Sequence, residues 1–183
     1  GYHPELLGEY AERQSASRRI LIAGVVAAIV IFFLLRMSLG SWRLATMSFL
    51  SLPMALVGGI LAAYFASRQI LSLGSLVGFL TILGVAARNG IMLISHYQHL
   101  EEFEGETFGL DLILRGAKER VAPIMMTAAT AGLALVPLAI AGNIAGNEIE
   151  HPMAIVILGG LVTSTLVNLF IVPVLYLRFG KTR

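Results

Sequence analysis

Five long apolar stretches dominate the pattern of hydrophobic and polar positions along the chain. Charged and polar residues are concentrated between these stretches, which cover about residues 20–37, 44–66, 70–96, 121–141 and 153–177. Since a helix rises 1.5 Å per residue, about 20 apolar residues cross the roughly 30 Å hydrocarbon core of a bilayer. The pattern predicts an all-α fold, a polytopic membrane bundle of five transmembrane helices.

Composition supports a lipid environment. The chain has 183 residues, of which 57% are hydrophobic and 13% charged, against about 45–50% and about 25% in soluble domains. It contains no cysteine, which excludes thiolate metal sites. The net charge of +2 comes without a basic stripe interleaved with aromatic residues, which disfavours a nucleic-acid partner. We therefore expect the bilayer to be the main partner of the chain.

The polar ends of the chain suggest three parts. Residues 1–19 form a lead-in, residues 20–178 the bundle and residues 179–183 a short tail. The lead-in has mixed charges, no initiator Met and no signal-peptide cleavage pattern, so we expect it to continue from an upstream part of a longer polypeptide.

The basic residues predict the orientation. With Arg88 set aside, four of the thirteen Lys and Arg flank one side of the spans, and eight flank the other: Arg36, Arg43, Arg115, Lys118, Arg120, Arg178, Lys181 and Arg183. Because cytoplasmic loops carry the excess of Lys and Arg, the C-terminus is expected in the cytoplasm and the N-terminus in the periplasm.

The segment between the third and fourth spans, "HYQHLEEFEGETFGLDLILRGAKER", has its own pattern. Phe108, Leu112 and Arg115 recur at helical spacing with acidic residues between them. This pattern predicts an amphipathic helix lying on the cytoplasmic surface, with a solvated linker helix as the alternative.

Small residues recur in the third and fifth spans. In lipid, glycine allows helices to approach closely, and packing drives their association there. The residues predicted to serve helix packing are Gly74, Gly78, Gly84, Gly159 and Gly160.

Arg88, in "GVAARNGIML", is the one charge that lies away from the ends of an apolar stretch. A charge at the centre of a membrane helix costs at least ~2.5–3.5 kcal/mol on insertion scales. We expect its guanidinium to face the bundle interior and pair with carboxylates; the alternative is an arginine that snorkels to the interface. No apolar stretch contains Asp or Glu, so the acidic partner is expected outside this chain.

Other polar groups in or near the spans are weaker candidates. Asn89, Thr127 and Thr130 could join a hydrogen-bonded network with Arg88, although a lone Thr more often bonds to its own helix. His96 and His99 have ligand spacing but too few neighbouring donors, so no metal site is predicted. No nucleophile triad, phosphate loop or carboxylate pair is present, so neither an enzyme nor a cofactor is expected.

Three segments, "GFLTILGVAARNGIMLISHYQHL", "LRGAKERVAPIMMTAATAGLALVPLAIAG" and "EIEHPMAIVILGGLVTSTLVNLFIVPVLYLRFG", carry a family resemblance. The chain resembles the C-terminal membrane portion of a resistance-nodulation-cell division (RND) efflux permease. The resemblance implies that the five spans are helices eight to twelve, half of an RND membrane domain. The lead-in would then be the end of a periplasmic insertion.

The resemblance also implies a site. In this family, helix ten commonly presents a basic residue toward acidic proton-relay residues of helix four. Arg88 stands at that basic position and Asn89 follows it, while Arg120 and Thr127 match polar positions of helix eleven. The implied mechanism is proton antiport, in which protonation of the absent acids weakens their pairing with Arg88. Since a guanidinium stays protonated, Arg88 is expected to act as a fixed counter-ion.

The segments "AARNGI", "SHY" and "GNEIEHP" are most similar to the heavy-metal efflux branch. The implied function is proton-driven export of heavy-metal or other cations across the inner membrane of a Gram-negative cell. A drug- or hydrophobe-exporting pump is one alternative, and a non-efflux module of the protein-export accessory or sterol-sensing type is another. The implied partners are the missing N-terminal half, further copies in a homotrimer, a periplasmic adaptor and an outer-membrane channel.

Overall fold

A computed structural model describes residues 4–67, 72–142 and 146–180, and no strand occurs within these ranges. The elements in chain order are α1 (Pro4–Leu39), α2 (Trp42–Ala62), the π-helical turn η1 (Ala63–Ser67), α3 (Leu73–Glu102), α4 (Leu110–Ala141), α5 (Glu150–Leu166), the π-helical turn η2 (Val167–Ile171) and α6 (Val172–Phe179). Since α5, η2 and α6 follow one another without a break, they form one long helix.

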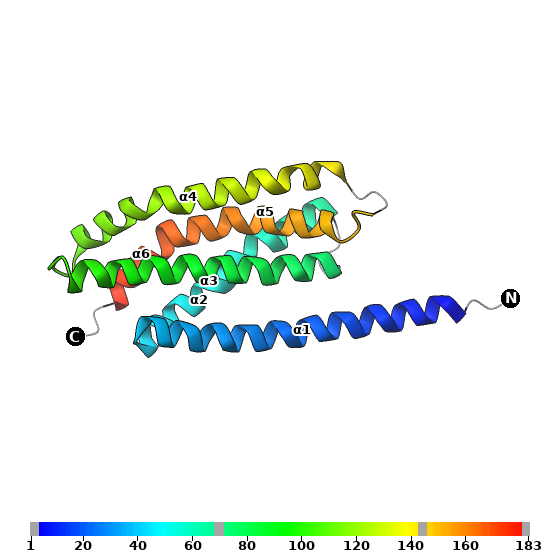
Figure 1. Ribbon diagram of the computed structural model, residues 1–183, viewed down its shortest axis with the longest axis horizontal. Coiled ribbons are helices and arrows are strands. Elements are labelled where there is room, and N and C mark those ends of the chain that lie inside the picture. Colours follow the sequence, from blue (N-terminus) through cyan, green and yellow to red (C-terminus); the bar gives the residue numbers. More distant parts are fainter. Residues whose placement is uncertain (1–3, 68–71, 143–145, 181–183) are drawn as a thin grey trace.

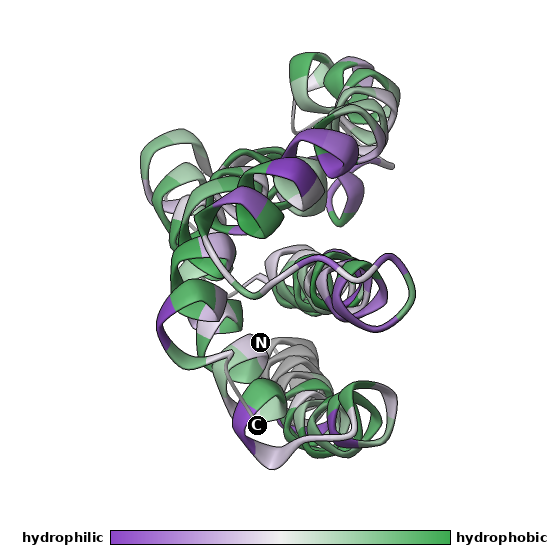
Figure 2. Ribbon diagram, turned by 90° about the vertical axis from the view of Figure 1, so that its left-hand side faces the viewer, coloured by the Kyte–Doolittle hydropathy of each residue, from purple (hydrophilic) through white to green (hydrophobic). Residues whose placement is uncertain are grey.

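Successive helices run in opposite directions, and α2 crosses the others at an angle (Figure 1). In the described part of the chain, five helices are long and apolar enough to cross a membrane, the last of them Glu150–Phe179. In Figure 2, which looks along the bundle, the helix bodies are mainly hydrophobic. The predicted all-α membrane bundle is confirmed.

Helix ends differ from the apolar stretches in two places. Residues 4–19, predicted as a separate lead-in, belong to the same helix as the first span. The amphipathic segment predicted as a separate surface helix is the beginning of α4, which continues without interruption to Ala141. The chain reverses instead between α3 and α4, where Gly105 has a φ of 68°. These helices extend beyond their apolar stretches because polar residues can continue a helix outside the hydrocarbon core of the bilayer.

The centre of the bundle is formed by α2, α3 and the α5 span. In the most apolar part of these helices 33%, 44% and 50% of residues are buried, against 6% in α1 and in α4. Helices α2 and α5 approach most closely at Gly58 and Gly159, where a Cβ on either glycine would overlap the other's backbone. Beside them, the Thr163 hydroxyl donates a hydrogen bond to the Ala55 carbonyl oxygen at 2.7 Å. The same hydroxyl accepts a hydrogen bond from the Gly58 N–H at 3.3 Å. Small residues and two interhelical hydrogen bonds thus hold this crossing together.

Of the four other glycines predicted to serve packing, three lie against a neighbouring segment and one does not. A Cβ on Gly74 would overlap the backbone of Ile149, one on Gly78 would lie 2.9 Å from the Val156 Cβ, and one on Gly160 would lie 2.6 Å from the Ile82 side chain. Gly84 is exposed and no heavy atom lies within 4 Å of its Cβ position. Within the described residues no helix packs against Gly84, so its role in helix packing stays a prediction.

Candidate functional site

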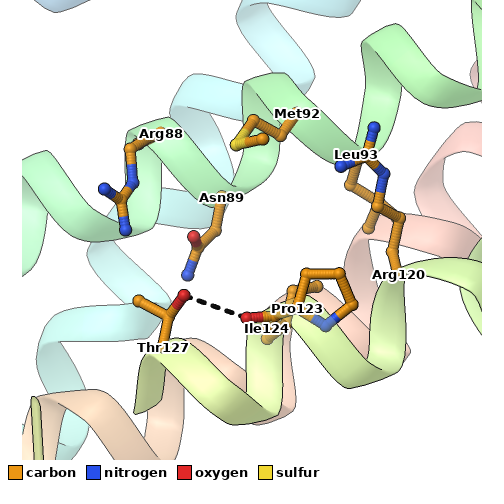
Figure 3. A pocket seen from close by; sticks show the side chains of 8 residues that line it. All are labelled: Arg88, Asn89, Met92, Leu93, Arg120, Pro123, Ile124 and Thr127. Carbon is orange, nitrogen blue, oxygen red and sulfur yellow. Dashed lines mark hydrogen bonds between the residues drawn. The ribbon is translucent and has the colours of Figure 1, made fainter. Parts of the chain in front are cut away.

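A pocket of about 210 Å³ lies between α3 and α4 (Figure 3). Its walls are formed by eight residues, four from each helix: Arg88, Asn89, Met92, Leu93, Arg120, Pro123, Ile124 and Thr127. All four residues predicted for the proton relay are in this set, although they are up to 39 residues apart in the sequence. Their role in a relay stays a prediction.

Arg88 lies near the middle of the 30-residue helix α3. The helix extends beyond the apolar stretch 70–96, however, and Arg88 lies eight residues before the end of that stretch, or roughly 12 Å of rise, so its guanidinium can reach the interface only by extending along the helix. The side chain is exposed and forms no ion pair with any residue in the described ranges. It belongs to an exposed stripe that recurs every three or four residues: Val77, Thr81, Gly84, Arg88 and Met92. This stripe is poorly suited to lipid, because it combines a cation, a hydroxyl and a glycine.

Asn89 and Thr127 face each other across the pocket (Figure 3). Asn89 is buried, with 8% of its surface exposed. The Thr127 hydroxyl donates to the Pro123 carbonyl oxygen at 2.9 Å, and the Thr130 hydroxyl donates to the Met126 carbonyl oxygen at 2.8 Å. Both threonines therefore bond to their own helix, and Thr130 does not line the pocket.

The pocket contains two cations and no acid. Arg88 lies at one end and Arg120 at the other (Figure 3), and none of the eight lining residues is Asp or Glu. Two guanidinium groups in a largely apolar space raise the local positive potential and favour an anionic group between or beside them. The described part of the site therefore favours an anionic partner.

A separate polar cluster lies at the ends of α3 and α4. His96 Nε2 and Glu119 Oε2 are 2.7 Å apart. Arg115 contacts three carboxylates: Glu119 at 3.2 Å, Glu106 at 2.6 Å, and Glu104. The sequence analysis missed this cluster, although the spacing of four residues between Arg115 and Glu119 is a signal for a helical ion pair.

Replacing Arg115 with glutamine is expected to loosen the turn at residues 103–109, because the guanidinium no longer holds Glu104 and Glu106. Exposed ion pairs contribute little to global stability, so amide hydrogen exchange in the turn should become a few-fold faster while exchange in the helix interiors stays unchanged. Mass-spectrometric exchange in the complete permease measures this. Lys118→Gln, an exposed change one turn further along α4, is the control, and equal exchange in both variants would contradict the assignment.

The two histidines considered as a metal pair contact different residues. His96 pairs with Glu119, whereas the His99 ring stacks on Phe103 with centroids 4.9 Å apart. Within the ranges that the structure covers, no group of three His, Cys, Asp or Glu side chains could hold a metal ion.

Comparison with known proteins extends these observations. The chain is 36% identical to protein HelA of Legionella pneumophila over 183 residues, which are 100% of this chain and 17% of HelA. It is 37% identical to the cobalt-zinc-cadmium resistance protein CzcA of Cupriavidus metallidurans over 177 residues, 96% of this chain and 16% of CzcA. A crystal structure of a heavy metal efflux pump matches with a TM-score of 0.76 and 30% identity, covering 96% of this chain and 17% of the pump.

The chain thus spans about a sixth of the length of these relatives. Residues 1–180 match the AcrB/AcrD/AcrF family, so almost the whole chain takes part in the match. Together with the five candidate spans, this match confirms the resemblance on which the sequence analysis relied. The chain belongs to the AcrB/AcrD/AcrF family of RND efflux permeases.

Proposed function

We propose that the chain forms one half of the membrane domain of a proton-driven RND permease that exports heavy-metal cations. The observation that carries the proposal is the pocket between α3 and α4, which brings Arg88 and Arg120 together without any acidic side chain. An uncompensated guanidinium inside a membrane costs several kcal/mol. The exposed stripe around Arg88 therefore receives a helix from the other half, and that helix supplies the acids.

The proton cycle follows from the chemistry of the two partners. Arg88 keeps its charge at any working pH, so only the carboxylates can exchange protons. When they are ionised, they pair with Arg88 across the pocket; when they are protonated, the attraction is lost and the two halves can move apart. Asn89 and Thr127 provide hydrogen-bonding groups beside this exchange. The chain is accordingly a transporter component and needs no catalytic nucleophile or cofactor.

Two lines of support favour metal cations over hydrophobic drugs as substrate. CzcA is described as a cobalt-zinc-cadmium resistance protein, and the structural neighbour is described as a heavy metal efflux pump. Within the complete protein we expect a homotrimer in the inner membrane of a Gram-negative cell, with a periplasmic adaptor and an outer-membrane channel as partners. The distribution of Lys and Arg supports a periplasmic N-terminus and a cytoplasmic C-terminus.

Transport by the complete permease in proteoliposomes tests this proposal. An imposed pH gradient is expected to drive movement of Zn²⁺, Co²⁺ or Cd²⁺ in the opposite direction to protons, read by metal-sensitive and pH-sensitive dyes. A protonophore should stop the metal flux. Metal flux that persists after the gradient collapses would rule out proton coupling, and transport of a hydrophobic dye without metal flux would favour the drug-exporting alternative.

A further inference from the structure

A groove of about 470 Å³ lies between the beginning of α2 and the end of α6, at residues that are not part of the Arg88 pocket. Its walls are mostly apolar or aromatic, from Trp42, Met47, Leu50, Leu175 and Phe179. Two further residues of α2, Arg43 and Thr46, complete the lining. This groove is more than twice as large as the Arg88 pocket, and the proposed transport cycle does not use it.

One end of the groove is charged and the other is apolar. Arg43 stands in the first turn of α2, whereas Leu50 lies seven residues later, or roughly 10 Å along the helix. Leu50 is 64% exposed, so the apolar end is open to the surroundings. The Thr46 hydroxyl already donates to the Trp42 carbonyl oxygen at 2.8 Å, which leaves its methyl group as the part available to a ligand. A ligand that fits must be polar at one end and apolar along its length.

Three guanidinium groups gather at the charged end. Arg43 lines the groove itself. The guanidinium of Arg36 lies over the Trp42 ring at 5.2 Å from its centroid, and that of Arg178 lies over the Phe179 ring at 5.6 Å. Because both rings line the groove, the cation–π contacts hold two more positive charges beside it.

No carboxylate from the same stretches of sequence neutralises these cations. Residues 20–66 and 151–183, which supply α2, α6 and Arg36, contain no Asp or Glu. At this end of the bundle, Glu104, Glu106 and Glu119 contact Arg115 and Glu101 contacts the Tyr176 hydroxyl. Among the described residues no carboxylate forms an ion pair with Arg36, Arg43 or Arg178. In addition, Arg36 Nε is buried without a hydrogen-bond partner in the part of the chain that the structure describes. The groove therefore attracts an anion.

We propose that this groove binds one anionic phospholipid, with its phosphate beside Arg43 and an acyl chain along Met47 and Leu50. Basic pockets between membrane helices attract anionic head groups, and an interfacial Trp is typical of the level at which head groups lie. The surrounding bilayer supplies the ligand in excess, so modest affinity suffices for occupancy. The proposal concerns lipid binding alone and stands or falls independently of the transported substrate.

Native mass spectrometry of the complete permease, titrated with phosphatidylglycerol or phosphatidylcholine, measures this binding. Phosphatidylglycerol is expected to bind more tightly than phosphatidylcholine. Arg43→Gln should weaken phosphatidylglycerol about fivefold, the loss expected for one basic residue near a head group. Met47→Trp, which fills the groove without changing charge, should weaken both lipids. Arg19→Gln, an exposed arginine at the opposite end of the first span, is the matched control and should change neither.

Four results would overturn the proposal. The first is equal affinity for both lipids in the unmodified protein. The second is unchanged phosphatidylglycerol binding in Arg43→Gln, which is an exposed change that does not threaten folding. The third is displacement of the bound lipid by glycerol phosphate, which has no acyl chains, because the groove would then recognise the phosphate alone. A cryo-electron microscopy map in phosphatidylglycerol nanodiscs locates the density, and a protein segment filling the groove would equally exclude a lipid.

Discussion

Replacing Arg88 with alanine in the complete permease is expected to abolish metal export while leaving the protein in the membrane at its normal level. Without a counter-ion, the carboxylates proposed to face Arg88 would hold their protons, because an isolated charge in an apolar space is disfavoured. The cycle would then stop in the protonated state. Because the carboxylates would no longer alternate between charged and neutral forms, export is expected to fall to the background of cells that lack the permease. Growth in toxic zinc or cobalt, with the exporter level measured by immunoblot, reads the effect.

Conservative changes separate charge from structure at this position. Arg88→Lys keeps a cation and should retain part of the export, whereas Arg88→Met keeps much of the length without the charge and should behave like alanine. Arg19→Gln removes an exposed arginine outside the pocket and should leave export unchanged. Normal resistance in Arg88→Ala at equal protein level would refute the counter-ion role.

Adding a single methyl group at Gly159 is expected to destabilise the bundle strongly. The new Cβ would overlap the Gly58 carbonyl oxygen and lie 2.5 Å from the Ala62 Cβ, so α2 and α5 would have to separate. Separation would also lengthen the hydrogen bond from Thr163 to Ala55, which is 2.7 Å in the structure. Overpacking of this kind costs about 1–3 kcal/mol. The melting temperature of the purified permease in detergent should fall accordingly, and Gly58→Ala should act in the same way.

Gly132 in α4 offers a matched control, because it is also a helix-interior glycine. A Cβ there meets only the Leu158 side chain, at 3.9 Å, which is ordinary contact. Gly132→Ala should therefore leave the melting temperature unchanged or raise it slightly, since alanine favours a helix over glycine. Similar losses at Gly132 and Gly159 would show that the α2–α5 crossing has no special role.

The fold could be predicted from the sequence because a helix needs a minimum length of apolar residues to cross the hydrocarbon core of a bilayer. The rule identifies the spans but not the helix ends, which is why residues 4–19 and the beginning of α4 were assigned to separate pieces. Which helices pack against each other was harder to predict from the sequence. Gly58 and Thr163 hold α2 against α5, yet a glycine or threonine in an apolar stretch looks the same whether it faces a helix or lipid.

The site was predicted in part, for reasons that differ between residues. Arg88 was identified from the sequence alone, because a charge in an apolar stretch needs a physical explanation. Thr127 was a candidate because it is polar within an apolar stretch, whereas Arg120 was reached only through the family resemblance. The structure places both in the lining of the pocket that contains Arg88. The pairing of His96 with Glu119 could not be inferred, since it depends on where the turn at residues 103–109 brings α4 back against α3.

The two walls of the Arg88 pocket differ in how tightly they are held, since 44% of the most apolar part of α3 is buried but only 6% of that of α4. A substitution in α3 disturbs the core and the pocket together. A substitution in α4, at Arg120 or Thr127 for example, can change the charge or size of the pocket with little effect on the rest of the bundle. Sequence variation that tunes the working pH of such a pump is therefore expected to accumulate in α4, while α3 changes little.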